Sequence, residues 1–493
     1  MGTGWPLRQL KLFLRDKMNR KRTKIVATIS DKRCEPEFIR ELYEAGINAI
    51  RINSAHLNIE GALKIVENGR RVSDRIPFIL DTKGPEIRTT SSDAPIQVEK
   101  GQRIKIIGDP DAKSSSACIF VTYPSFAGEV PVHSSILIDD GEVELTVESV
   151  DGNILECTAC NDGVIGSRKS VNVPKVAFSL PSVSEKDRVF LAFAAAQDID
   201  FIAHSFVRTK QDVLDVQAIL DSHKSEAKII AKIENQEGVD NIDEILDNVY
   251  GIMVARGDLA IEIPYEKIPG IQRMIIQKCI ERRKPVIVAT QMLHTMISNP
   301  RPTRAEVSDI ASAIYSYADA MMLSGETANG RYPVEAVKTM TRVAMEVESN
   351  TEKYLEMPAG EMTGQVSAYL AKVAVKTSIR VGARGIVADT ARGRTIRNMA
   401  AFRGRNLILA QCYSYRTMRE LALSFGVYAG YQEKKRSVDE FLKIALRSST
   451  SAHDLQNEDI IVVLAGNFSK GTGFSFIEVG TVEYLKDRVS IID

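Results

Sequence analysis

Lys232, Glu234 and Asp258 are the residues of this chain whose types and spacing most directly suggest chemistry. Lys232 and Glu234 close the apolar run KIIAKIE, and Asp258 follows the next such run, YGIMVAR. Alternate side chains of a strand point to the same face, so Lys232 and Glu234 point the same way. Two carboxylates at neighbouring strand ends suit Mg²⁺, which takes one or two protein carboxylates and leaves positions for substrate oxygens and water. The alternative is a buried network in which Glu234 simply pairs with Lys232 or Arg256.

Polar side chains close the other apolar runs as well. They are cations, carboxylates, amides and hydroxyls: Arg51 and Asn53; Asp81, Thr82 and Lys83, with Arg88; Ser205 and Arg208; Thr290 and Gln291; Ser324 and Glu326. Each alone is more often a helix cap or a satisfied core group. A purely structural protein would have little use for so many of them in one place, so the set indicates an active site. The chain has neither GxxxxGKS/T nor GxGxxG after a strand, so arginines, lysines and a metal would have to hold any phosphate.

Eight short β-branched runs must position these residues. The runs lie at 24–30, 47–53, 77–82, 200–206, 228–234, 250–256, 285–291 and 318–324. Amphipathic stretches such as EPEFIRELYEAG separate them, with apolar residues at helical spacing. Strands buried on both faces that alternate with helices predict a parallel sheet, and eight such units predict a closed (β/α)₈ barrel, the TIM barrel. Active sites of this fold lie at the carboxyl ends of the strands, where Lys232 and Glu234 fall.

Two segments depart from this repeat. Residues 89–176 switch to short β runs with the turn signals DDG, DGN and NDG, which predict an inserted small β-barrel that could act as a lid over the mouth of the main barrel. Beyond residue 348 new βα units begin, and the runs at 384–390, 406–412 and 459–466 predict an open α/β sheet. We also expect a final apolar strand at the end of residues 482–493. The predicted domains are a basic extension over 1–22, a catalytic barrel over 23–88 and 177–348, the inserted domain over 89–176, and a C-terminal α/β domain over 349–493.

Composition narrows the class of partner. Lys plus Arg and Asp plus Glu both number 64 in 493 residues, so no net charge recruits nucleic acid or an anionic membrane. No apolar run is long enough to cross a bilayer. Six scattered cysteines are typical of reduced thiols in a cytoplasmic protein, and Cys157 and Cys160 face opposite ways in a strand-like run, as packing residues rather than zinc ligands would. These features favour a small-molecule substrate.

The basic N-terminus is set apart from the rest of the chain. Residues 1–24 hold eight Lys or Arg against the single Asp16, and apolar residues from Leu7 to Met18 recur at helical spacing. We expect a helical extension packed on the body or on a neighbouring subunit, with a transit-like or surface-binding segment as the alternative.

Longer motifs contain these residues: 81-DTKGPEIR-88, 229-IIAKIEN-235, 253-MVARGDL-259, 289-ATQML-293, 299-NPRPTRAEVSD-309 and 323-LSGETANGRYPVEAV-337. On these motifs the chain resembles the pyruvate kinase family over roughly residues 20–490. The resemblance implies phosphoryl transfer from phosphoenolpyruvate to ADP, which gives pyruvate and ATP in the last step of glycolysis. It also implies a cytoplasmic homotetramer that requires Mg²⁺ or Mn²⁺.

The resemblance implies a role for each site residue. Glu234 and Asp258 would hold the divalent metal, and Lys232 would neutralise the phosphoryl group in transfer. Thr290 would assist protonation of the enolate through a water relay, with Ser324 and Glu326 behind it. The substrate would also meet Arg51, Arg88, Ala255, Arg256, Gly257, Asp258 and Thr290. The nucleotide would meet Asn53, His56, Arg88 and Lys169.

Two positions of the barrel depart from the family pattern. Asn53, Asp81 and Thr82 match its potassium ligands, but Ala55 stands where a serine is expected, with Ser54 beside it. Since Glu86 resembles the potassium-dependent type, we expect a K⁺ site with one oxygen ligand missing. Ala260 stands where the RGDLG motif has its last glycine, and it could shift the loop after Asp258 or be harmless.

The C-terminal domain resembles the family's effector domain. The turn 390-TARGRT-395, with Thr390, Arg392, Gly393 and Thr395, lies where regulated members hold a sugar phosphate, although Arg392 replaces a small hydroxyl residue. The loop 466-GNFSKGTG-473 only loosely resembles its partner loop. Control by a phosphorylated effector is therefore a hypothesis.

Two other functions are compatible with the same residues. One is a magnesium-dependent carbon–carbon lyase that acts through a pyruvate enolate. The other is a catalytically altered paralogue that serves as an oligomeric partner. The inserted domain and the position of Lys232 favour phosphoryl transfer over the lyase, and the intact Lys232, Glu234, Asp258 and Thr290 argue against the paralogue.

Overall fold

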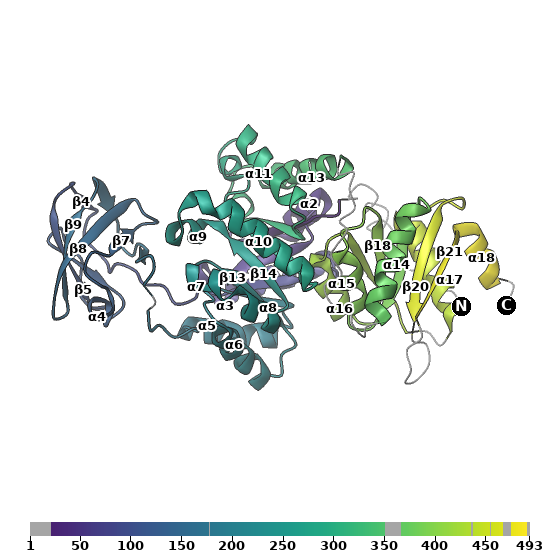
Figure 1. The fold of residues 1–493 in the computed structure, drawn as a ribbon, viewed down its shortest axis with the longest axis horizontal. Helices are drawn as coiled ribbons and strands as arrows, with labels where there is room; N and C mark the ends of the chain where they lie inside the picture. Colours follow the sequence, from purple (N-terminus) through teal and green to yellow (C-terminus); the bar gives the residue numbers. More distant parts are fainter. Residues whose placement is uncertain are drawn as a thin grey trace.

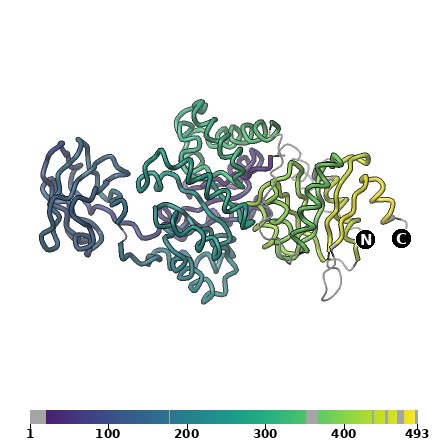
Figure 2. Tube along the Cα trace, viewed as in Figure 1, coloured from purple at the N-terminus to yellow at the C-terminus, as the bar shows by residue number. Residues whose placement is uncertain are grey.

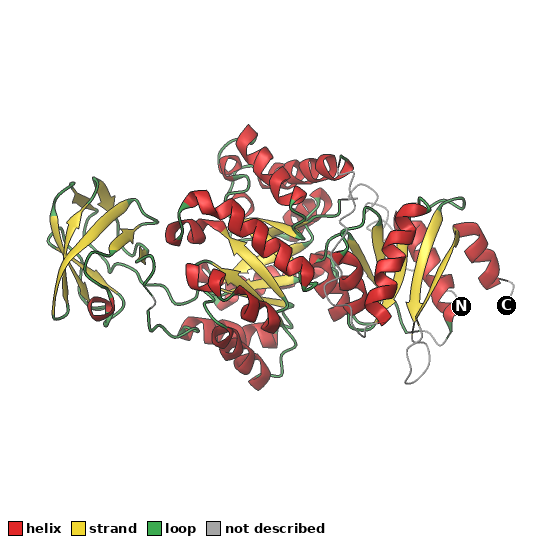
Figure 3. Ribbon diagram, in the orientation of Figure 1, coloured by secondary structure: helices red, strands yellow, loops and turns green. Residues whose placement is uncertain are grey.

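The computed structural model describes residues 21–176, 178–350, 366–434, 437–453, 455–466 and 475–490. The described chain forms three bodies in a row: an all-β body at one end, a barrel in the middle and a helix-flanked sheet at the other end (Figures 1 and 3). Most of the predicted basic extension, the linker after residue 350 and most of the loop 466–473 lie outside the described residues.

The eight predicted strand runs close into a parallel barrel, so the (β/α)₈ prediction is confirmed. The strands, in their order around the barrel, are β1 (Lys24–Thr28), β2 (Ala49–Asn53), β3 (Phe78–Asp81), β12 (Phe201–His204), β13 (Lys228–Ile233), β14 (Gly251–Ala255), β15 (Val286–Ala289) and β16 (Ala320–Leu323). Pairing of β16 with β1 closes the ring, because Ala320 is in register with Lys24 and Leu323 with Ala27.

Helices surround the barrel (Figure 3). They are α2 (Pro36–Ala45), α3 (Ile59–Val72), α5 (Glu185–Ala196), α6 (Lys210–Ser222), α7 (Gln236–Asp240), α8 (Ile242–Asn248), α9 (Arg256–Glu262), α10 (Ile268–Glu281), α11 (Arg304–Tyr315), α12 (Gly325–Ala328) and α13 (Pro333–Ser349). Capping boxes fix the first turns of α5, α6 and α11, where the pairs Ser184 and Asp187, Thr209 and Asp212, and Thr303 and Glu306 satisfy exposed backbone amides.

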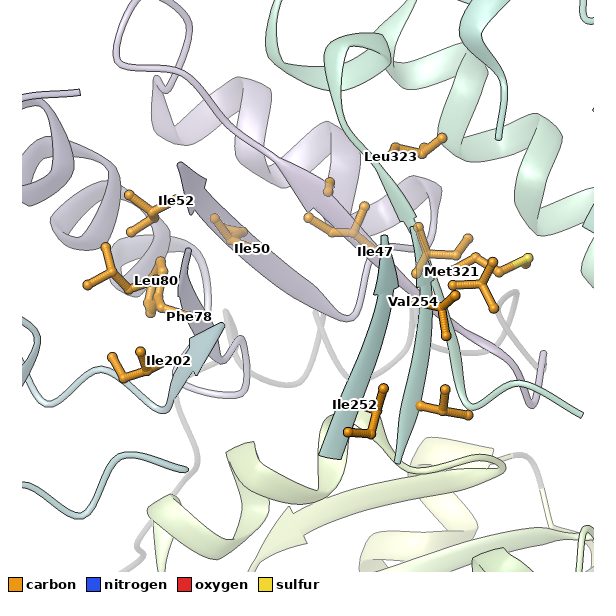
Figure 4. Close-up of a cluster of buried hydrophobic side chains, with 14 of the residues drawn as sticks. Ile47, Ile50, Ile52, Phe78, Leu80, Ile202, Ile252, Val254, Met321 and Leu323 are labelled. Atoms are coloured by element: carbon orange, nitrogen blue, oxygen red, sulfur yellow. The ribbon is translucent and has the colours of Figure 1, made fainter. Parts of the chain in front are cut away.

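Strand alternation divides the barrel core into two layers. Ile50, Ile52 and Leu80 belong to the outer layer between strands and helices (Figure 4), whereas Ala49 and Ile230 belong to the inner layer. Residues two further along the same strands, Arg51 after Ala49 and Lys232 after Ile230, must therefore point inward near the carboxyl ends. The same alternation places apolar side chains inside the barrel near the amino-terminal ends of the strands and charged side chains inside it near their carboxyl ends.

Between β3 and β12 the chain forms a β-rich body with its own apolar core. Its strands are β4 (Ile96–Val98), β5 (Arg103–Gly108), β6 (Cys118–Val121), β7 (Ser135–Ile138), β8 (Val143–Asp151), β9 (Ile154–Ala159), β10 (Gly163–Ile165) and β11 (Val171–Asn172), with one short helix, α4 (Phe126–Glu129). They form a six-stranded and a two-stranded sheet. Two chain segments connect this inserted domain to the barrel (Figure 2).

The C-terminal part is an open sheet with the strand order β19, β18, β17, β20, β21. Its strands are β17 (Gly385–Thr390), β18 (Leu407–Cys412), β19 (Val427–Tyr431), β20 (Ile460–Gly466) and β21 (Ser475–Thr481), and its helices are α14 (Val366–Arg380), α15 (Arg394–Ala401), α16 (Tyr415–Glu420), α17 (Val438–His453) and α18 (Val482–Ser490). The three strands predicted here are confirmed as β17, β18 and β20.

The predicted final strand is wrong as far as the described chain reaches, because Val482–Ser490 form helix α18. Val482, Leu485 and Val489 recur at helical spacing and are buried against β20 and α17, so the helical period takes precedence over the β-branched end of the sequence. The last strand is β21, and it runs antiparallel to β20.

The amino-terminal end of the barrel is sealed by the C-terminal domain. Leu423 joins the inner core of the barrel, and Arg403 forms a two-pronged pair with Asp319, with nitrogen–oxygen distances of 2.8 and 2.5 Å. The same carboxylate accepts the backbone N–H groups of Phe425 and Val286. Both side chains of the pair are almost fully buried, at 1% and 4% exposed, so water can replace neither partner.

Replacing Arg403 with methionine should therefore leave Asp319 charged and buried without its counter-ion. We expect Arg403→Met to lower the free energy of unfolding by about 3–5 kcal/mol in urea titrations. Arg405→Met, two residues away at an exposed position, is the matched control and should change the midpoint little. Equal unfolding midpoints for the two variants would contradict the conclusion that the Arg403–Asp319 ion pair holds the C-terminal domain to the barrel.

Candidate active site

A buried cluster of charges lies at the carboxyl end of the barrel around the ammonium group of Lys232. Its Nζ lies 2.9 Å from Glu234 Oε1 and 3.1 Å from Asp81 Oδ1, and it donates a hydrogen bond of 2.7 Å to Ser205 Oγ. Asp81 Oδ2 in turn accepts from Arg51 Nε at 2.5 Å. The five groups come from β2, β3, β13 and the turns after β12 and β13, which the closed barrel brings to one point.

Burial and pairing oppose each other in this cluster. Burial alone would lower the pKa of Lys232, but the carboxylates of Asp81 and Glu234 outweigh it and raise that pKa above its ordinary value. For a carboxylate the effect of burial has the opposite sign, and burial alone would raise the pKa of Asp81. The cations of Arg51 and Lys232 nevertheless hold that pKa below its usual range. The cluster therefore keeps a charged ammonium and a charged carboxylate in a site that excludes water.

Glu234 has a different balance from Asp81. Burial raises its pKa against the lowering effect of Lys232, and the neighbouring Asp258 carboxylate adds to the rise. Glu234 Oε2 accepts the backbone N–H of Phe206 at 2.7 Å. Glu234 Oε1 has only the ion pair with Lys232, whose geometry is not that of a hydrogen bond, so among the described residues this buried oxygen has no hydrogen-bond donor. A carboxylate oxygen has more than one lone pair, so this oxygen can take a second partner beside Lys232.

Glu234 and Asp258 line one cavity of about 360 Å³ between the barrel mouth and the inserted domain. Its wall carries six carboxylates and two cations: Glu86, Glu234, Glu237, Asp240, Asp258 and Glu262, with Lys175 and Arg208. Within the described chain no three His, Cys, Asp or Glu side chains gather round one point, so a metal here would have Glu234 and Asp258 as its protein carboxylates. That sparse, all-oxygen set fits Mg²⁺ or Mn²⁺, and Glu234 Oε1, which has only its ion pair with Lys232, has room for a metal as well.

Arg256 does not contact Glu234, although the sequence left that pairing open. Its guanidinium lies 2.7 Å from both oxygens of Asp309 and donates to the carbonyl of Thr290 at 2.7 Å. The side chain of Arg256 thus braces the loop that carries Thr290.

Thr290 stands on strained backbone, with φ of 68°, and Gln291 follows with φ of 54°. Its hydroxyl accepts the backbone N–H of Gly257 at 2.8 Å and donates to the carbonyl of Ala289 at 2.7 Å. Non-glycine residues in this region of backbone space cluster at functional sites, because surrounding structure must hold them there. The strain aims the hydroxyl at the first turn of α9, next to Asp258.

Glu326 and Ser324, the two residues predicted to stand behind Thr290, meet through the backbone. Glu326 is buried and its two oxygens accept the backbone N–H groups of Leu293, at 3.0 Å, and Ser324, at 2.8 Å. The carboxylate therefore ties the loop after β15 to the end of β16. Its contact with Ser324 runs through the amide and not the hydroxyl.

Of the predicted nucleotide ligands, Arg88 and Lys169 lie at the start and end of the inserted domain, and Asn53 and His56 lie at the end of β2. Arg88 is paired with Glu86 at 2.8 Å and donates to the carbonyl of Arg168 at 2.6 Å, and Lys169 is paired with Asp139 at 2.6 Å. Arg88 and Ser170 form an isolated antiparallel bridge, which places Lys169 beside Arg88. His56 is exposed on the turn after β2, next to Asn53.

The three potassium-ligand positions share the edge between β2 and β3, where Asn53 is in register with Asp81. Asn53 Oδ1 accepts the N–H of Ala55 at 3.2 Å, and the carbonyl of Thr82 accepts from Ser205 Oγ at 2.7 Å. The carbonyl of Ala55 accepts from Lys186 Nζ at 3.1 Å. Ala55 thus lacks the expected side-chain oxygen, and its backbone oxygen already accepts a hydrogen bond from Lys186.

Two further sequence questions have structural answers. Ala260 is exposed on α9, where alanine favours the helix over glycine by about 1 kcal/mol, so its methyl group supports the helix that carries Asp258. In the C-terminal domain Thr390 Oγ1 accepts the N–H of Gly393 at 2.9 Å, and Gly393 has φ of 74° at the start of α15. Arg392 is exposed and Thr395 half-buried on the same turn.

Sequence reasoning missed three contacts of this site. Asp81 is the partner of Lys232 as well as of Arg51, a pairing that strand alternation signals because all three point inward at the same height. The other two contacts join the Phe206 N–H to Glu234 and the Asp309 carboxylate to Arg256. No sequence pattern predicts them, because loop geometry decides both.

A parallel eight-stranded barrel with a buried ammonium, paired inward carboxylates and an inserted domain over its mouth defines a barrel enzyme built to handle an anionic substrate. Comparison with known proteins identifies the family. Residues 20–337 match the family model for the pyruvate kinase barrel domain, and residues 369–478 match that for the pyruvate kinase alpha/beta domain. The chain belongs to the pyruvate kinase family.

Named relatives cover nearly the whole chain. A pyruvate kinase of Borreliella burgdorferi is 46% identical over 468 residues, which is 94% of this chain and 98% of the relative. One of Clostridium acetobutylicum is 39% identical over 90% of this chain and 96% of its own length. The crystal structure of a pyruvate kinase from Cryptosporidium parvum superposes with a TM-score of 0.87 at 32% identity, covering 94% of this chain and 96% of that one. Among the helices of the described residues, none combines the length and apolar character needed to cross a membrane.

Proposed function

We propose that this enzyme transfers the phosphoryl group of phosphoenolpyruvate to ADP in the cavity between the barrel mouth and the inserted domain. The observation that carries the proposal is the position of Lys232, a buried ammonium that contacts Glu234, while Glu234 lines the cavity and keeps one oxygen without a hydrogen-bond donor. The products would be pyruvate and ATP.

Lys232 would stabilise the phosphoryl group while it passes between the two substrates. The transferring group spreads negative charge over its oxygens, so positioning and electrostatics supply most of the catalysis. Asp81 and Glu234 keep the ammonium charged, and Ser205 fixes its direction through a 2.7 Å hydrogen bond. A preorganised cation of this kind needs no rearrangement when the charge develops.

Glu234 and Asp258 would hold Mg²⁺ or Mn²⁺. When bound, the metal supplies concentrated positive charge for the oxygens of an anionic substrate. This positive charge is needed because the six carboxylates in the cavity wall would otherwise repel the phosphate groups of both substrates and the carboxylate of phosphoenolpyruvate.

Arg51, Arg88 and the backbone of residues 255–258 would bind the substrate anions. Arg51 is already held by Asp81, whereas Arg88 has to leave Glu86 to reach a phosphate. The Thr290 hydroxyl would assist protonation of the enolate through water. Because that hydroxyl now donates to the carbonyl of Ala289, a proton moving through it requires this hydrogen bond to exchange. Asn53, His56, Arg88 and Lys169 would bind the nucleotide.

The lyase remains the alternative to be excluded by experiment. A carbon–carbon lyase would release pyruvate without ADP, whereas a phosphotransferase requires ADP and forms ATP in equal amount. Membership of the family and the place of Lys232 favour the phosphotransferase.

Lys232→Met tests the assigned role of the ammonium group. We expect the kcat for ATP formation from phosphoenolpyruvate and ADP to fall by about 10³, the cost of losing one strong transition-state contact. Binding of Mn²⁺, followed by electron paramagnetic resonance, should persist because Glu234 and Asp258 remain. Lys228→Met, at the other end of the same strand, is the matched control and should keep activity within about twofold. Retention of more than a tenth of the activity, or loss of Mn²⁺ binding, would contradict this role.

We infer that Asn53, Asp81 and Thr82 hold K⁺ with one oxygen fewer than the family pattern. Support comes from Ala55, whose methyl group offers no ligand and whose carbonyl already accepts from Lys186. Ser54 Oγ, fully buried and without a hydrogen-bond partner among the described residues, lies beside it.

Potassium should activate the enzyme only at raised concentration. We expect rates in K⁺ to exceed those in Na⁺ or tetramethylammonium, and Ala55→Ser to lower the K⁺ concentration for half-activation about fivefold, because one oxygen ligand is restored. Equal rates of the natural enzyme in all three salts would refute a K⁺ site.

We also infer that the enzyme is a cytoplasmic homotetramer and that the turn 390–395 binds a phosphorylated effector. The likeness to the family supports the cytoplasmic location and the homotetramer. The Thr390 hydroxyl and the Gly393 amide at the start of α15 support the effector site. Fructose bisphosphate, ribose 5-phosphate and AMP, titrated in turn, should include one that moves the phosphoenolpyruvate saturation curve, and Arg392→Ser should alter that response. Curves that no candidate moves would count against the effector site.

A further inference from the structure

The inserted domain is joined to the barrel by two chain segments, and both are gripped by side chains outside the catalytic cluster. We call residues 82–88 the outgoing linker and residues 178–182 the return linker. Figures 1 and 2 show the inserted domain well separated from the barrel, with these connections spanning the gap. Whatever fixes the linkers therefore fixes where the inserted domain stands.

Asp187 grips the outgoing linker. Its carboxylate accepts the backbone N–H of Lys83 at 2.7 Å and that of Gly84 at 3.1 Å, while also closing the capping box of α5 with Ser184. Gly84 has φ of 72°, and a Cβ there would lie 2.8 Å from Ser205 Cβ, so only glycine lets the linker pass this close.

Arg208 grips the return linker. Its Nη1 donates to the carbonyl of Phe178 at 3.0 Å and its Nη2 to the carbonyl of Leu180 at 3.1 Å. Asp212 fixes the guanidinium from behind, with Oδ1 3.0 Å from Nη2, and also caps the first turn of α6. Both hydrogen bonds come from a charged, planar donor whose geometry is set by Asp212, so they are stronger and better directed than neutral ones.

Both linkers contact the turn of residues 205–208, which also contacts the catalytic cluster. Ser205 Oγ donates to the carbonyl of Thr82 in the outgoing linker, at 2.7 Å, and accepts from Lys232. The Phe206 N–H donates to Glu234, and Arg208 follows two residues later. One four-residue turn thus contacts both linkers, the catalytic lysine and a predicted metal ligand.

We propose that Arg208 is a positioning residue that clamps the return linker to the turn 205–208 and so sets the place of the inserted domain over the cavity. The proposal rests on the proposed function in one respect: Arg88 and Lys169, carried on the inserted side, bind the nucleotide. Phe178 and Leu180 also pack against the core of the inserted domain, so the clamp acts on residues that belong to that domain's packing. Loss of the clamp lowers the fraction of molecules whose inserted domain is placed for ADP, and the apparent affinity for ADP falls by that fraction.

A purely structural role for Arg208 predicts something else. If Arg208 only stabilises the start of α6, its loss lowers the unfolding midpoint and affects both substrates alike. The clamp predicts a selective effect on ADP, because the barrel-bound groups Arg51, Glu234 and Asp258 do not depend on the return linker.

Arg208→Gln should raise the KM for ADP about tenfold, since it removes two charge-assisted hydrogen bonds, and should leave the KM for phosphoenolpyruvate within about twofold. Backbone amides of residues 173–176 and 178–182 should exchange hydrogen faster in the same variant, measured by mass spectrometry in the absence of substrates. Arg188→Gln, an exposed arginine on α5 in the same part of the barrel, is the matched control and should change neither reading.

Arg208→Lys decides the case if the glutamine variant does not fold. It keeps the charge beside Asp212, but an ammonium cannot reach both carbonyls with the planar fork of arginine, so the KM for ADP should rise by a smaller factor. An unchanged KM for ADP in a folded Arg208 variant, or equal rises for both substrates with a lower unfolding midpoint, would overturn the proposal. If the natural enzyme formed no ATP, the proposed function would fail, while unchanged amide exchange would separately refute the clamp.

Discussion

The active end of this barrel depends on one constraint, which is that the ammonium group of Lys232 is buried and must remain charged. An isolated charge in this environment would lose its proton or unfold the site. Asp81, Glu234 and Ser205 prevent that, and each of them is held by a further group: Asp81 by Arg51, Glu234 by the Phe206 amide, Ser205 by the Thr82 carbonyl. Much of the local backbone geometry follows from these second contacts. The positive φ of Phe206, for example, presents its amide to Glu234.

The sequence predicted those features of the fold and of the site that follow from a repeating pattern of apolar residues. The barrel strands are short β-branched runs, and alternation along β13 places Lys232 on the inner face, with Glu234 directly after the strand on the same side. The pairing of Lys232 with Asp81 joins residues 151 positions apart, and only the closed ring decides that their heights match. The side chain of Arg256 shows the limit: the sequence left its pairing with Glu234 open, and the structure pairs it with Asp309 from α11.

The same limit explains the error at the C-terminus. The end of the sequence is rich in β-branched residues, and local propensity favoured a strand, yet Val482, Leu485 and Val489 bury one helical face. The hydrogen bonds of Glu326 could not be foreseen either. Both of its oxygens accept backbone amides, an outcome that depends on the loop from β15 passing close by.

Leu423 carries a consequence for how the molecule is made. This side chain completes the inner core of the barrel, although it lies about a hundred residues beyond the last barrel strand. On the ribosome the whole barrel sequence emerges before Leu423 does, so the nascent barrel has an open floor with apolar residues facing water. Closure of the ring is also late, since β1 must wait for β16. The barrel is therefore synthesised before the C-terminal domain but is sealed only after Leu423 has been made.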